Sequence, residues 1–552
     1  MTMRNIYTIC GLVALLGGIA CDQPLVADNE NQPDRARALA RAADVETFIA
    51  NSYNSVFNGT IGGSNDALQP GFLVMGFESY SGNSNFNMAT RGQIPRSFVD
   101  NNRGNQAETL QLRDWTFGHR AARSSAIGLA RINAGVSFAS APRDERNRAF
   151  AWFVMGAGLG NLALAYDSVS VIRWDDPPSQ DHFPLEHYSA AMQRALAYLD
   201  TAILTAQNAP AGADGFPLPV LFLNGATGGF AGGAVSQADF IRFIRSHKAR
   251  FRASVARDPT ERVAVDWNAV IADVQNGITR DYQLNGNPAG GWSVIWPLQH
   301  YLFQSWHQMW GLIVGMADTS GGYNTWLGLS DAAKVPFVVQ TPDRRFPAGA
   351  SRATQNANSP VVPPAGLYFR NRPPGADVLT TNTLANSFYD HYRFQAFFNA
   401  TRIGSYPVMT RAEMNGLIAE GAVRTGQWAL AAQFIDSSRV RNNLPAVAGI
   451  ADLTTPVPGG AACVPKVPAP PSYTSAACGN IFEAMKWEYR METAFTGYGN
   501  WYFAGRGWGD LPEGTPVHFP VPYQEMDVRV QPFYNIGGAG LPGGAARGTY
   551  GR

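Results

Sequence analysis

The chain has 552 residues, a length that predicts one large domain or two modest ones. Hydrophobic residues make up 45% and charged residues 15%, so the composition excludes the disordered and coiled-coil classes. The formal net charge of +1 supplies no overall field to attract nucleic acid, and we expect no nucleic-acid partner. The 57 glycines and 36 prolines predict many turns, and the 13 tryptophans, 20 tyrosines and 31 phenylalanines favour a binding protein.

The first residues have the features of an export signal. Arg4 precedes an apolar stretch, residues 6–20, that is shorter than the roughly 20 residues a membrane-spanning helix requires. We therefore interpret residues 1–20 as a signal peptide. The next residue, Cys21, follows a small residue, as the acylated cysteine of a bacterial lipobox does.

The resulting prediction is a lipid anchor at Cys21 and a polar tether over residues 21–42, which holds a folded domain of residues 43–552 away from the bilayer. The alternative is an ordinary cleaved signal followed by an incidental cysteine.

Two further cysteines, Cys463 and Cys478, lie in a segment rich in Ala, Pro and Gly. An oxidising compartment allows them to pair. Their spacing differs from that of CxxC motifs, and no histidine is near, so a disulfide is favoured over a zinc site.

Periodic apolar residues predict helices in pairs. Residues 143–167 and 188–207 each repeat apolar positions at spacings of three and four, which predicts one helix hairpin. Gly156 and Gly160 interrupt the first helix and indicate close approach of neighbouring helices. Ser236 caps a further helix and Asp266 opens another over residues 267–276, which gives a second hairpin.

The clearest helix pair comes later in the chain. Thr410 and Glu413 have the spacing of a capping box, and a turn at residues 425–426 leads into a second helix that begins near Trp428. The glycine, aromatic and small residues of this turn are typical of tetratricopeptide repeats. Long stretches with little periodicity, which we expect to carry function, lie between the helical regions: residues 58–105, 277–390 and 456–479.

No catalytic or cofactor-binding pattern stands out. His300 and His307 lack an acidic partner at ligand spacing, and the adjacent Asp175 and Asp176 have poor geometry for acid–base catalysis. The sequence contains neither a dinucleotide-binding nor a phosphate-binding glycine loop. We therefore expect no catalytic residues, no metal and no cofactor, and we predict that the protein is not an enzyme.

Aromatic residues gather in one of the irregular stretches, between residues 290 and 326. Because aromatic rings stack on sugars and on peptide side chains, we predict a ligand-binding face there. An earlier stretch adds an aromatic ring, an amide and a cation that suit hydroxyls or carboxylates. The candidate ligand-binding residues are Tyr80, Asn85, Arg91, Trp292, Trp296, Tyr323 and Trp326.

Several short motifs lie close together in the carboxyl-terminal part of the chain. They are residues 412–414 (AEM), 424–427 (RTGQ), 439–445 (RVRNNLP), 486–492 (KWEYRME), 505–511 (GRGWGDL) and 519–522 (FPVP). Together these motifs resemble the SusD/RagB family, most strongly within residues 407–527.

This resemblance implies a mainly α fold, with tetratricopeptide-like helix hairpins in a superhelical core and long irregular loops that form a ligand-binding face. It also implies a cell-surface lipoprotein of the outer membrane. Such a protein binds oligosaccharides or peptides and delivers them to a SusC-type TonB-dependent transporter. Two alternatives stay open: a structural or adhesive surface lipoprotein that binds other proteins, and a glycan hydrolase of the same uptake system.

Overall fold

The computed structural model of the protein describes residues 39–62, 67–82, 87–105, 111–176, 183–225, 233–294 and 307–552. By its internal contacts the chain divides into residues 1–45 and residues 46–552, and each unit is described by itself. In the first unit, Arg41 and Asp44 form an exposed ion pair of 2.8 Å. Cys21, Asn85 and Trp296 lie outside the described residues.

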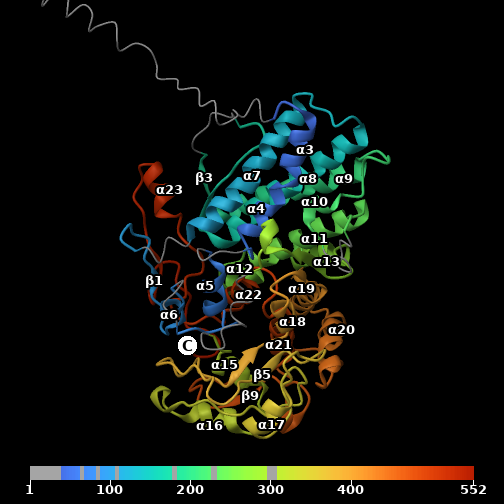
Figure 1. The fold of residues 1–552 in the computed structure, drawn as a ribbon. Coiled ribbons are helices and arrows are strands. Elements are labelled where there is room, and N and C mark those ends of the chain that lie inside the picture. Colours follow the sequence, from blue (N-terminus) through green and yellow to red (C-terminus); the bar gives the residue numbers. More distant parts are fainter. Residues whose placement is uncertain are drawn as a thin grey trace, which may run out of the picture. The chain divides into compact units, whose positions relative to one another are not determined.

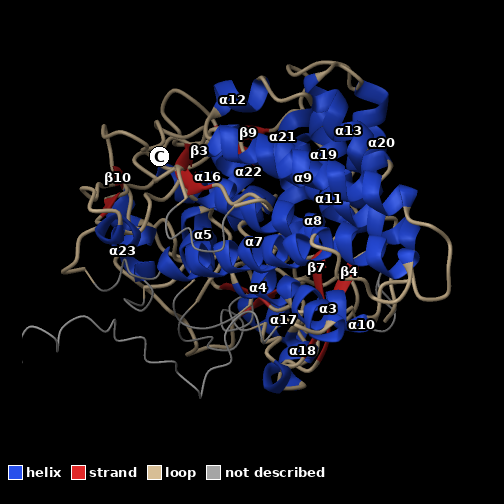
Figure 2. Cartoon of the chain, turned by 90° about the horizontal axis from the view of Figure 1, so that it is seen from above, coloured by secondary structure: helices blue, strands red, loops and turns tan. Residues whose placement is uncertain are grey.

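The second unit consists mainly of helices, and its strands are short (Figures 1 and 2). Its amino-terminal half contains the longest helices, α7 and α8. The helices of this half, with α3 spanning the boundary of the two units, are α3 (Ala42–Ala50), α4 (Ser52–Asn58), α5 (Gln69–Met75), α6 (Met88–Gly92), α7 (Gln111–Asn133), α8 (Ala141–Ala165), α9 (Tyr188–Asn208), α10 (Val220–Leu223), α11 (Gln237–Ser254), α12 (Pro259–Val263) and α13 (Trp267–Gln275).

The carboxyl-terminal half alternates short helices with longer ones. Its helices are α15 (Gly311–Val314), α16 (Gly322–Gly328), α17 (Arg352–Ala357), α18 (Gln395–Asn399), α19 (Arg411–Arg424), α20 (Trp428–Arg439), α21 (Ile481–Thr493), α22 (Asn500–Trp508) and α23 (Tyr523–Val528). Single 3-10 turns lie at Pro288–Gly290, Gly315–Ala317, Asp331–Ala333, Val440–Asn442 and Gly460–Ala462.

The strands of the described residues form two-stranded antiparallel ribbons. The pairs are β1 (Phe98–Val99) with β10 (Ile536–Gly537), β2 (Ser168–Ser170) with β3 (Leu185–His187), β4 (Tyr282–Gly286) with β7 (Gly404–Met409), β5 (Phe369–Asn371) with β6 (Tyr389–His391), and β8 (Lys466–Pro468) with β9 (Ala476–Cys478). A disulfide joins Cys463 to Cys478, the pair expected from the sequence, and ties the β8–β9 ribbon to the chain before it.

The predicted fold class is confirmed. Helices α8 and α9, α11 and α13, and α19 and α20 pack against each other as the predicted hairpins. Small residues permit the close packing of α8. A Cβ atom at Gly156 would lie 2.7 Å from Leu199 of α9, and one at Gly160 would lie 2.2 Å from Phe251 of α11. Both distances are far shorter than a van der Waals contact, so α8 requires glycine at these crossings.

Helix α8 is also long and apolar enough to span a membrane, but 83% of its most apolar stretch is buried within the protein. That burial is typical of a core helix.

The predicted caps are present, with one difference. The side chains of Ser236 and Asp266 accept backbone N–H groups of α11 and α13, and Thr410 Oγ1 accepts the N–H of Glu413 at 3.0 Å. The Glu413 carboxylate forms a buried pair with Arg250 of α11, in which both contacts measure 2.6 Å. Because Glu413 is used in this way, Thr410 caps α19 without the reciprocal bond of a capping box.

Residues 67–81 of the first irregular stretch lie in the core and not on an exposed face, while later residues such as Gln93 and Arg103 are exposed. Every residue from 67 to 81 is buried. Phe72 of α5 packs on the rings of Tyr502 and Phe503 of α22, with centroids 4.7 Å and 4.9 Å away. This packing fixes the chain that leads to Tyr80.

Candidate ligand-binding site

Tyr80 and Arg91 do not face a ligand. The Tyr80 side chain is 4% exposed, and its ring packs edge-on against Trp310 at 5.1 Å. Arg91 is 3% exposed and donates a hydrogen bond to the backbone oxygen of Phe98 in β1 at 3.3 Å. The prediction that these two side chains bind ligand is wrong for this structure, because tertiary packing turns both inward.

Tyr323 and Trp326 are likewise core residues. They are 1% and 2% exposed, and their rings stack with centroids 5.9 Å apart. The Tyr323 hydroxyl donates to the backbone oxygen of Leu312 at 2.7 Å, and Lys334 Nζ lies 5.2 Å from the centroid of Trp326. Their spacing of three residues places both rings on the inner side of α16, so the predicted ligand contacts are again corrected to core packing.

Trp292 is the predicted ligand residue that the structure places at the surface. Its side chain is half-buried. Its backbone N–H donates to the oxygen of Asn287 at 3.0 Å, and the Asn287 N–H donates back to the oxygen of Trp292 at 2.9 Å. Gly291 closes this loop with a φ of 80°, a conformation that favours glycine. The loop therefore holds the indole in a defined position.

The Trp292 ring lies over helix α4. Its centroid is 5.0 Å from that of Phe57. Two amides of the same helix hold the loop, since Asn54 Nδ2 donates to the Gly291 oxygen at 3.1 Å and Asn58 Nδ2 donates to Asn54 Oδ1 at 2.8 Å. Arg113 of α7 donates to the backbone oxygen of Asn58 at 3.1 Å. We call Asn54, Asn58, Arg113 and Trp292, which cover the buried ring of Phe57, the Trp292 surface.

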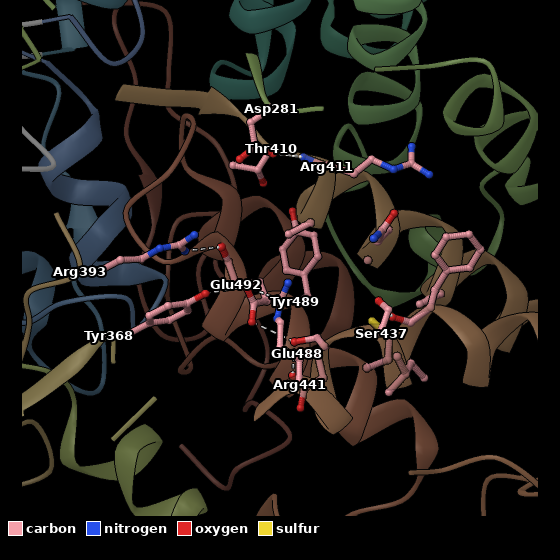
Figure 3. Close-up of a pocket in the computed structure, with 18 residues that line it drawn as sticks. Asp281, Tyr368, Arg393, Thr410, Arg411, Ser437, Arg441, Glu488, Tyr489 and Glu492 are labelled. Atoms are coloured by element: carbon pink, nitrogen blue, oxygen red, sulfur yellow. Dashed lines mark hydrogen bonds and ion pairs between the residues drawn. The ribbon is translucent and has the colours of Figure 1, made fainter. Parts of the chain in front are cut away.

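A cavity of about 220 Å³ lies between α19, α20 and α21 (Figure 3). Its walls also include residues that come from distant parts of the chain, Asp281 before β4, Tyr368 before β5 and Arg393 after β6. The cavity is smaller than the roughly 300–1,000 Å³ of typical ligand pockets, so it can accept one end of an oligomer and not its whole length.

Glu492 is the centre of a dense polar network in the wall of this cavity. Its carboxylate accepts hydrogen bonds from Tyr368 Oη at 2.9 Å and Ser438 Oγ at 2.9 Å. Arg441 Nη2 lies 3.0 Å from the same carboxylate. Burial alone would raise the pKa of Glu492, but the charges of the surrounding arginines, Arg345 first among them, lower that pKa to about 2.

Glu488 forms part of the same wall and is less fully paired. Its Oε2 atom accepts from Arg345 Nη1 at 2.9 Å and lies 2.6 Å from Ser438 Oγ, whose single proton is shared with Glu492. Its Oε1 atom accepts no hydrogen bond from the described residues and lies 3.6 Å from Arg439 Nη1. Burial raises the pKa of Glu488, so the two glutamates of the wall differ in their affinity for a proton.

A second cavity, of about 410 Å³, lies between α9, α11 and α12. Tyr188 lines it, and its hydroxyl donates to Glu261 at 2.5 Å. Burial and the bond to Glu261 raise the pKa of Tyr188 to about 12. Within the described part of the chain, no group of three or more His, Cys, Asp or Glu side chains could hold a metal ion.

Sequence reasoning missed the cavity of α19, α20 and α21. One signal was present: residues 486–492 alternate charged and apolar side chains within a helix that is almost wholly buried. Buried charges require partners, so this helix pointed to an internal polar network.

No family model matches the sequence, and no curated protein matches it. The fold does match solved structures. A SusD superfamily protein from Bacteroides vulgatus ATCC 8482 is 12% identical, with 88% of this chain and 90% of that chain covered and a TM-score of 0.52.

Two further matches have TM-scores of 0.49. A SusD superfamily protein from Parabacteroides distasonis ATCC 8503 is 13% identical, with 90% of this chain and 98% of that chain covered. A laminarin-binding SusD-like protein is 12% identical, with 90% of this chain and 99% of that chain covered. The fold assignment rests on the first match, and by it the chain has the fold of the SusD superfamily.

Proposed function

We propose that the protein is a SusD/RagB-type lipoprotein of the cell surface, anchored in the outer membrane through Cys21. It captures oligosaccharides or peptides and hands them to a SusC-type TonB-dependent transporter. It is a binding protein and not an enzyme. The observation that carries this proposal is the SusD fold, which extends over most of the chain.

The Trp292 surface is the proposed place of first capture. The half-buried indole of Trp292 offers a stacking face, and the amides of Asn54 and Asn58 and the guanidinium of Arg113 hold the loop and helix beneath it. The loop of residues 287–292 holds the ring in advance, so little conformational entropy is lost when a ligand stacks on it. Each stacking contact of this kind contributes little binding free energy, which suits a protein that must release its ligand.

Calorimetry with a panel of neutral glycans, acidic glycans and peptides tests the capture function. We expect at least one oligomer to bind without being cleaved, and the Trp292→Ala variant to bind it several-fold more weakly. The matched control is Trp428→Ala, which removes another half-buried indole on α20 and should leave ligand affinity unchanged. Hydrolysis of the bound ligand would favour the hydrolase alternative, and binding of proteins alone would favour the adhesive one.

A further inference from the structure

Two arginines that line the cavity of α19, α20 and α21 have neutral partners. Arg393 Nη1 donates to the backbone oxygen of Glu492 at 3.0 Å, and its guanidinium lies 4.2 Å from the ring centroid of Tyr368. Arg411 Nη1 donates to the backbone oxygen of Ile278 at 3.0 Å. Among the described residues, the ion pairs within 4.0 Å include neither guanidinium. Neither guanidinium forms a direct ion pair, although the charge of Arg393 acts on the Glu492 carboxylate and helps to lower its pKa.

The charged side chains that line the cavity are balanced in number, with three arginines and three carboxylates. Arg345, Arg393, Arg439 and Arg441 surround Asp343, Glu488 and Glu492 in one network. Asp436 acts on Arg439 and adds a fourth negative charge to these four positive ones. On the opposite wall, Arg411 lies beside Asp281, whose Oδ1 atom accepts the Arg411 backbone N–H at 2.7 Å. Burial lowers the pKa of the Arg411 guanidinium.

Half-buried guanidinium groups are costly unless an anion compensates them, and a carboxylate matches their fork of donors in geometry and charge. The remaining walls fit the body of a small residue. Phe434, Ile435 and Met485 supply apolar surface, and Tyr489 and Ser437 supply hydroxyl groups. Figure 3 shows Arg393 and Arg411 on different sides of this space.

We infer that the cavity of α19, α20 and α21 binds the carboxylate-bearing terminal residue of an oligomer, with Arg393 and Arg411 as the groups that recognise the anion. The inference rests on the proposed capture function and adds to it a second subsite, distant in sequence from the Trp292 surface. A uronic acid and a peptide carboxyl terminus share the required chemistry.

The test uses calorimetry on the full chain with two matched pairs of probes. The first pair is a trigalacturonate and the neutral trigalactose. The second is a tripeptide with a free carboxyl terminus and the same peptide amidated. We expect the acidic member of one pair to bind at least tenfold more tightly than its neutral counterpart, and this affinity to fall as NaCl rises from 50 to 500 mM.

Variants locate the anion site. Arg393→Gln and Arg411→Gln should each weaken the acidic probe about tenfold, the usual effect of losing one charge-assisted contact. Asp281→Asn keeps an acceptor for the Arg411 N–H but removes a negative charge, so it should strengthen binding several-fold. The control, Arg173→Gln, removes an exposed arginine that pairs with Glu186 at 3.2 Å and should change nothing.

Equal affinity for acidic and neutral probes would overturn the inference, and so would unchanged binding in an Arg393→Gln/Arg411→Gln variant with the parent's unfolding midpoint. If neutral probes bind and Trp292→Ala weakens them, only the acidic subsite fails and the capture function stands. If no probe of any class binds, the capture function fails as well. Asp281→Asn is expected to strengthen binding of the acidic probe, so it tests the inference even where an arginine variant does not fold.

Discussion

The substitution Trp326→Ala should destabilise the protein and leave ligand binding intact. The indole is buried, stacks on Tyr323, and lies 6.2 Å from the ring of Phe337 and 5.2 Å from Lys334 Nζ. Truncation of a buried tryptophan costs about 3–5 kcal/mol, and each aromatic pair adds about 0.5–1.5 kcal/mol beyond its area.

The indole N–H of Trp326 in the parent protein offsets part of this loss in stability. Within the described residues, no group accepts a hydrogen bond from the Trp326 indole N–H, which is itself buried. An unsatisfied buried donor costs about 1–3 kcal/mol, and the alanine variant no longer has it. The net loss in the free energy of unfolding is therefore expected to be about 3 kcal/mol.

Urea denaturation followed by tryptophan fluorescence measures this loss, and calorimetry with the ligand identified for the parent measures affinity under native conditions. Trp292→Ala is the matched comparison, because it removes a half-buried indole and should lower affinity with a much smaller loss of stability. A Trp326→Ala variant that has the stability of the parent but no longer binds ligand would refute the reasoning and restore Trp326 as a ligand contact.

Three further outcomes follow from the contacts described above. Thr410→Ala should lower stability by about 1 kcal/mol in denaturant titration, with ligand binding unchanged, because α19 loses its cap; equal stability would show that the cap contributes nothing. Glu492 has its pKa lowered on folding, so its ion pairs stabilise the protein above the unfolded pKa of about 4.3, and that stability is lost as pH falls toward 2. Glu492→Gln should therefore be less stable at pH 7 and show a weaker dependence on pH below 5 in acid titration, and an unchanged acid transition would contradict this. Replacing both Cys463 and Cys478 by alanine should cost about 3 kcal/mol in the chain-entropy model, measured against the parent in non-reducing buffer; no difference would indicate that the loop is ordered without the bond.

Local signals made the helices of the repeats predictable. Helix α8 was expected at residues 143–167 and lies at Ala141–Ala165, and α9 was expected at 188–207 and lies at Tyr188–Asn208. Caps such as Ser236 and Asp266 act within one helical turn, so the sequence alone contains the whole interaction. The glycines of α8 were equally informative, because a glycine in a helix that still forms marks a close crossing.

Helix α7 shows where such reasoning fails. Its buried side combines the large side chains of Trp115, Leu129 and Ile132 with small residues, namely Ala121, Ala122, Ser125 and Gly128. No helix was predicted over these residues. The helix forms because these small residues let α7 pack closely on its neighbours, α4 and α8.

The candidate site could be predicted only in part. Trp292 is at the surface because a tight loop of its own residues presents it. Tyr80 and Trp326 are buried by Trp310 and Phe337, and no short-range pattern shows which ring will cover another. The cavity of α19, α20 and α21 was not predictable from local sequence, since Arg393 and Asp281 reach it from elements far from these helices.

Purification of the tagged full-length chain from detergent-solubilised outer membranes, with mass spectrometry of the proteins that accompany it, tests the proposed capture and delivery most directly. We predict that a TonB-dependent transporter co-purifies in near-stoichiometric amount. We also predict that the Cys21→Ser variant, whose described fold does not involve this residue, loses its place in the membrane fraction. Isolation of the lipidated protein from the membrane without any transporter, in the presence of its ligand, would contradict the account.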